Sequence, residues 1–79
     1  MLNELKALIE EAKKYHLASM DESASEEETD AAYLEFWARL EKIADVLVEI
    51  TGGGIDRQTA MKMAHSKQDK ILELVSRVA

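Results

Sequence analysis

The chain has 79 residues, which is enough for one small domain. It contains no cysteine, which excludes disulfides and thiolate metal sites, and its net charge of −6 disfavours sequence-independent binding to nucleic acid, which needs Lys and Arg against phosphate. A hydrophobic content of 47% argues against disorder, and the absence of proline together with only three glycines favours long helices.

The first predicted helix covers about residues 3–18, with Asn3 as its N-cap. Apolar residues recur in it at steps of mostly three and four residues, which is the pattern of one buried helix face. This face comprises Leu5, Leu8, Ile9, Ala12 and Tyr15.

The second predicted helix covers residues 26–51 and is the central element of the expected fold. Ser25 followed by Glu28 is typical of a capping box, in which the serine hydroxyl accepts a backbone N–H at the helix start. Apolar residues then recur at spacings of 3, 4, 3, 4 and 3, which predicts one buried stripe. The stripe comprises Tyr33, Phe36, Leu40, Ile43, Leu47 and Ile50. Three consecutive glycines, Gly52 to Gly54, predict the end of this helix.

The last predicted helical segment covers residues 57–78, with Asp56 as its N-cap. Its apolar residues keep the same rhythm of three and four, which allows one continuous helix. Ser66 followed by Asp69 is a second N-cap signal, which predicts a break near residue 66 instead. Both arrangements are compatible with the sequence.

The expected fold is an all-α bundle of three helices, or of four if the last segment breaks, in which the long central helix packs against the other elements. At 1.5 Å per residue, the central helix is roughly 39 Å long and the first helix roughly 24 Å. The first helix therefore leaves apolar surface on the central helix uncovered, which predicts a homodimer. The candidate interface residues are Leu34, Trp37, Val46, Val48, Met61 and Met63.

No pattern in the chain predicts a catalytic residue, a cofactor or a metal ion. His16 and His65 lack the Glu-x-x-His spacing of metal sites in helical bundles, so neither is expected to be a ligand or a catalytic base. The acidic run in residues 21–30 lacks the glycine and the final glutamate of a calcium-binding loop. We expect this run to be solvated or to form a docking surface.

Three further carboxylates, Glu41, Asp45 and Glu49, recur every four residues on the central helix. They lie on the face opposite the apolar stripe, so we expect them to be exposed. Acid–base catalysis by paired carboxylates needs a pocket around them, and an exposed helix face does not supply one.

The start of the chain has no basic segment followed by an apolar core, so we expect no secretory signal. No apolar run approaches the roughly 20 residues that cross a bilayer, so we expect no membrane association. Together with the lack of cysteine, these features predict a cytoplasmic protein.

The function expected from these features is that of a non-enzymatic accessory protein that binds other proteins through a helical surface. One alternative is a small helix-turn-helix-like DNA-binding regulator that uses residues 57–78, where phosphate contacts could come from Lys62, Lys67, Lys70 and Arg77. The other alternative is an acidic inhibitor that mimics nucleic acid with the carboxylates of residues 21–49. No motif of a specific family is present; short acidic helical chains of this style are common among small bacterial and phage proteins.

Overall fold

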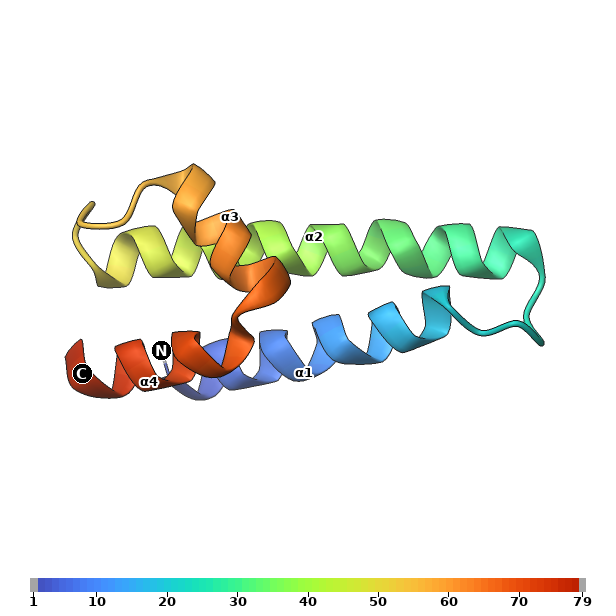
Figure 1. Ribbon diagram of the computed structural model, residues 1–79, viewed down its shortest axis with the longest axis horizontal. Coiled ribbons are helices and arrows are strands. Elements are labelled where there is room, and N and C mark those ends of the chain that lie inside the picture. Colours follow the sequence, from blue (N-terminus) through green and yellow to red (C-terminus); the bar gives the residue numbers. More distant parts are fainter. Residues whose placement is uncertain (1, 79) are drawn as a thin grey trace.

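The computed structural model describes residues 2–78, and the side chains of residues 3–77, as an all-helical fold with no strand. Its four helices are α1 (Leu2–Ser19), α2 (Glu26–Ile50), α3 (Arg57–Ser66) and α4 (Gln68–Val78). The first two helices form a long antiparallel hairpin, and α3 and α4 form a shorter pair that lies over only one half of it (Figure 1). None of these described helices combines the length and the apolar content that crossing a membrane requires.

Both predicted ends of α2 are confirmed by their hydrogen bonds. The Ser25 hydroxyl accepts the backbone N–H of Glu28 at 3.2 Å, and three glutamates occupy the first turn, where the helix dipole favours negative charge. At the other end, Gly53 N–H donates to the carbonyl of Val48 and Gly52 N–H donates to that of Glu49. These two bonds form a Schellman motif, which needs the positive φ angles of 60° and 87° at Gly52 and Gly53.

The prediction that Asn3 is the N-cap of α1 is wrong. The helix begins at Leu2, so Asn3 lies within its first turn. An N-cap residue has to flank the helix with a non-helical backbone, and Asn3 therefore cannot occupy that position.

The C-terminal segment breaks into two helices, one residue beyond Ser66. Lys67 has the non-helical angles φ −135° and ψ 46°, and its carbonyl accepts the N–H groups of Lys70 and Ile71. The break is thus confirmed, but Ser66 does not cap α4, because it is the last residue of α3 and Lys67 is the residue that precedes α4. The Ser66 hydroxyl is hydrogen-bonded to His65 Nδ1 at 3.1 Å. The one-residue link is shorter than the three- or four-residue turn of a DNA-binding helix-turn-helix.

Asp56 caps α3 as predicted, and its carboxylate accepts the backbone N–H of Thr59 at 2.7 Å. Hydrogen bonding by Thr59 lowers the pKa of Asp56 below its ordinary value of 3.8. A lowered pKa in the folded state means that the stabilisation is complete above the ordinary value and is lost as the pH falls through the lowered one.

This cap predicts a pH-dependent difference between the wild type and Asp56→Asn. The asparagine keeps a capping oxygen at every pH, whereas the aspartate loses its charge in acid. As the pH is lowered from neutral to about 2, we expect the thermal midpoint of the wild type to decrease relative to that of the variant. A difference in midpoint that does not change with pH would contradict the capping role of the charged carboxylate.

A single hydrophobic core draws on all four helices. The predicted face of α1 is buried as far as Ala12, and Tyr15 is half-buried. The stripe on α2 is buried only in its middle, since Tyr33 is 50% exposed and Ile50 is half-buried. The fully or nearly fully buried residues of the core are Leu5, Leu8, Ile9, Ala12, Phe36, Leu40, Ile43, Ala44, Leu47, Ala60, Ala64, Ile71 and Val75.

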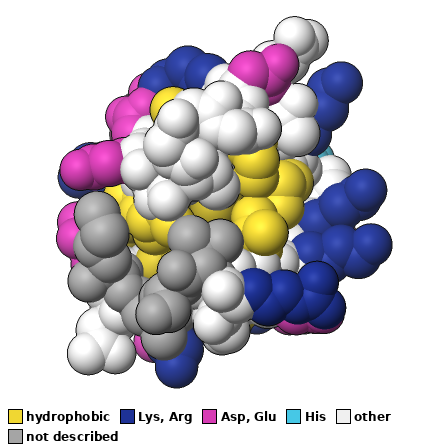
Figure 2. Space-filling view, turned by 90° about the vertical axis from the view of Figure 1, so that its left-hand side faces the viewer, with side chains coloured by type: hydrophobic (Ala, Val, Ile, Leu, Met, Phe, Trp, Pro, Cys, Tyr) yellow, Lys and Arg dark blue, Asp and Glu magenta, His cyan; other side chains and the backbone are white. Residues whose placement is uncertain are grey.

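The packing of the C-terminal pair differs from the expectation that the whole segment lies on the central helix. The main contacts of α2 are with α1 and α3, while α4 contacts α1 and α3. The helix break at Lys67 causes this difference, because it turns α4 back alongside α1 (Figure 1). Seen from the end that carries the α2–α3 loop, apolar side chains lie between charged ones, and Lys and Arg gather along one edge (Figure 2).

Candidate interaction surface

The largest exposed apolar side chains lie where α3 and α4 do not reach. We call residues 13–37 the distal half of the hairpin; in Figure 1 it extends beyond the α3–α4 pair to the α1–α2 loop. Among the described residues, the exposed large hydrophobic side chains all belong to this half, at 50 to 69% exposure. They are Leu17, Met20, Tyr33 and Leu34. Clustering of this kind at one end of a small protein is typical of an interaction site.

These four residues continue the side of the hairpin that α3 and α4 cover elsewhere. Tyr33 and Leu34 precede Trp37 by four and three residues, and these spacings place side chains on one helix face. Trp37 itself contacts the C-terminal pair, because its ring stacks on that of His65 with centroids 5.6 Å apart. Leu17 follows Lys13 by four residues, and Lys13 lines a cleft at the α3–α4 junction. We call Leu17, Met20, Tyr33 and Leu34 the distal face.

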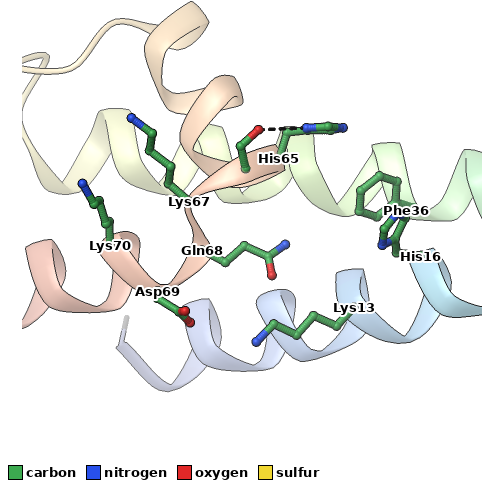
Figure 3. Close-up of a pocket in the computed structure, with 9 residues that line it drawn as sticks. Lys13, His16, Phe36, His65, Lys67, Gln68, Asp69 and Lys70 are labelled. Atoms are coloured by element: carbon green, nitrogen blue, oxygen red, sulfur yellow. Dashed lines mark hydrogen bonds between the residues drawn. The ribbon is translucent and has the colours of Figure 1, made fainter.

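A cleft of about 430 Å³ separates the distal face from the C-terminal pair. Phe36, which is only 4% exposed, contributes its apolar wall, and Gln68 extends from the α3–α4 junction toward α1 (Figure 3). Three lysines and one carboxylate line it, which makes it a positively charged site on a negatively charged protein. We call it the basic cleft. Its lining residues are Lys13, His16, Phe36, His65, Ser66, Lys67, Gln68, Asp69 and Lys70.

The two histidines meet at the basic cleft around one pair of aromatic residues. His16 stacks on Phe36 with ring centroids 4.8 Å apart, and the His65–Phe36 centroid distance is 6.1 Å. Phe36 and Trp37 are in edge contact at 5.9 Å. Both histidines are thus in ring contact with aromatic neighbours, and within residues 2–78 no three His, Asp or Glu side chains gather to hold a metal ion.

The α1–α2 loop and the start of α2 carry the opposite charge. Residues 21–30, which we call the acidic tip, contain six Asp or Glu residues, and no Lys or Arg lies between Lys14 and Arg39. The Ser23 hydroxyl and backbone N–H both donate to Asp21, and these bonds lower the pKa of its carboxyl. The molecule therefore has a negative tip at one end of the distal face and a positive cleft at the other.

The six predicted interface residues do not form one surface. Leu34 lies on the distal face, while Trp37 and Met61 line a second, smaller cavity of about 240 Å³ together with His65. The remaining three are half-buried and pack against the core: Val46, Val48 and Met63.

Sequence reasoning missed Leu17 and Met20 as surface residues. Leu17 is not part of the apolar repeat of α1, and Met20 lies just beyond the end of this helix, so neither is expected on the buried face. The sequence therefore indicates that both side chains are exposed, but it does not indicate that they belong to an interaction surface. It also gave no sign that His16 and His65 both contact Phe36, because residues far apart in the chain are brought together only by the fold.

The predicted exposure of Glu41, Asp45 and Glu49 is confirmed. Asp45 forms an ion pair with the Arg57 guanidinium, and both side chains are more than half exposed. Because exposed pairs contribute little, we expect Asp45→Ala with Glu49→Ala to change the free energy of unfolding by less than about 0.5 kcal/mol. Urea denaturation measures this, and a loss well above that value would show that these side chains are covered in solution.

No family model, no curated protein and no solved structure compared with the chain matches it. The features that bear on function are therefore the distal face, the basic cleft and the acidic tip.

Proposed function

We propose that the protein is a non-enzymatic interaction module that binds another protein chain through its distal face. The observation that carries this proposal is the exposure of Leu17, Met20, Tyr33 and Leu34 on the half of the hairpin that α3 and α4 leave uncovered. Two packed helices bury only the stripe between them, so a further layer is needed to cover an apolar side. Tyr and Trp, both present here, are residue types favoured at interfaces. A cytoplasmic location is part of the same proposal.

A protein partner is favoured over nucleic acid by the charge of this surface. The distal half carries no Lys or Arg beyond Lys14, and its tip carries six acids. Phosphate groups would be repelled there, whereas an apolar face bordered by charge suits another protein.

Site-specific photo-crosslinking tests this function. A photoreactive residue placed at Leu34 should give a discrete crosslinked protein product in cells that express the chain. The matched control is the same photoreactive residue at Lys42, which is exposed on the same helix outside the distal half. Crosslinking at position 34 but not at position 42 supports the proposal, and the absence of a product at position 34 contradicts it.

A further inference from the structure

We infer that the partner on the distal face is a second copy of this chain, packed antiparallel so that the acidic tip of each copy lies against the basic cleft of the other. This inference rests on the proposed function and adds the identity and the orientation of the partner. It is carried by three observations: the position of the cleft, the distribution of charge and the shape of the hairpin.

The position of the cleft fits a two-fold arrangement. The distal face lies between the basic cleft, which includes Phe36, and the acidic tip, which includes Glu26. Ten residues of helix separate these two, or roughly 15 Å. A two-fold axis through the middle of this span brings each tip to the partner's cleft, and both copies use the same surface, as a closed dimer requires.

The charges select this orientation over a parallel one. In a parallel pair, two tips with six acids each would face one another, and like charges at an interface are repulsive. In the antiparallel pair, each tip faces Lys13, Lys67 and Lys70 of the partner's cleft. Asp69 is the one carboxylate among the residues that line this cleft. The uneven charge of a single copy thus becomes two identical attractive contacts.

The shape of the hairpin supplies the apolar part of the contact. Two antiparallel distal halves laid face to face form a four-helix bundle, whose core would take in Tyr33, Leu34 and Leu17 from both copies. A stable interface takes about 800 Å² from each partner, roughly a seventh of the accessible surface of 5301 Å². The distal half comprises 25 of the 79 residues, which is a larger share of the chain than the share of the surface that such an interface buries.

A charge swap tests the orientation. The tip variant carries Glu22→Lys and Asp30→Lys, which lie outside the first turn of α2, and the cleft variant carries Lys67→Glu and Lys70→Glu. In sedimentation at low salt, each variant should dissociate with a Kd about tenfold or more above that of the wild type. A chain that carries all four changes should have a lower Kd than the cleft variant, because the two lysines introduced in the tip then face the two glutamates introduced in the cleft.

The matched control is Lys6→Glu with Lys42→Glu, which changes the net charge as the cleft variant does but at exposed residues outside the distal half. Its Kd should stay well below that of the cleft variant. A four-change chain whose Kd is no lower than that of the cleft variant would overturn the antiparallel orientation. All five chains should give the same helical signal by circular dichroism, which shows that dissociation is not unfolding.

The outcomes separate this inference from the proposed function. If the wild type is monomeric and position Leu34 crosslinks to a protein of a different mass, the partner is not a second copy of this chain. The proposed function as an interaction module would still hold, and we would then expect the partner to be a protein with a basic surface that faces the acidic tip. A dimer that persists unchanged in Leu34→Ser with Leu17→Ser places the contact elsewhere and contradicts the distal face itself.

Discussion

Leu40→Asp is expected to abolish folding. Leu40 is fully buried at the middle of α2, inside the core to which all four helices contribute. Removing a leucine side chain from such a site costs about 2–5 kcal/mol, and an unpaired charge buried in its place costs more. The sum is comparable with the whole stability of a small domain, about 5–15 kcal/mol. Circular dichroism should show loss of the helical signal at room temperature.

The same substitution at Leu34 is the matched control. Leu34 lies on the same helix and is 69% exposed, so Leu34→Asp should retain the helical signal of the monomer. It should also weaken association through the distal face. An unchanged thermal midpoint in Leu40→Asp, or unfolding by Leu34→Asp, would contradict the assignment of core and surface on α2.

Ala60→Leu together with Ala64→Leu is expected to displace α3 from α2. Both alanines are fully buried, they lie one turn apart on α3, and α3 packs against α2. Larger side chains at closely packed positions cost about 1–3 kcal/mol each, because neighbouring side chains and backbone have to move. Urea denaturation should show this loss, and amide hydrogen exchange should show faster exchange in α3 and α4 than in α1 and α2.

Lys62→Leu is the control for this prediction, because Lys62 is exposed on the same helix. It should change the free energy of unfolding by less than about 0.5 kcal/mol. If the variant with Ala60→Leu and Ala64→Leu is as stable as the wild type, α3 does not pack closely on the hairpin.

The sequence predicts those parts of the fold that depend on local signals. Ser25 and Asp56 are followed by the residues whose N–H groups they accept, and Gly52 and Gly53 supply the positive φ angles just beyond the end of α2. The buried middle of the α2 stripe follows from its period, because Phe36, Leu40, Ile43 and Leu47 recur at steps of four, three and four residues and are all buried.

The ends of the stripe could not be predicted, because their burial depends on how far α3 and α4 extend. The break at Lys67 sends α4 back alongside α1, and Tyr33, beyond the reach of both C-terminal helices, stays 50% exposed. The basic cleft is a product of the same turn, since it brings Lys67 and Lys70 toward Lys13 of α1. Helical periodicity describes one helix at a time and contains no information about the length over which two helices overlap.

We expect a second copy of the chain to cover the distal half of the hairpin in solution. The decisive measurement is the light-scattering mass of the wild type across a concentration series, at low and at high salt. We predict that the mass rises from 8.9 kDa toward twice that value with concentration, and that high salt shifts the rise to higher concentration because it screens the contact between tip and cleft. A mass that stays at 8.9 kDa at every concentration and at both salt levels would contradict it.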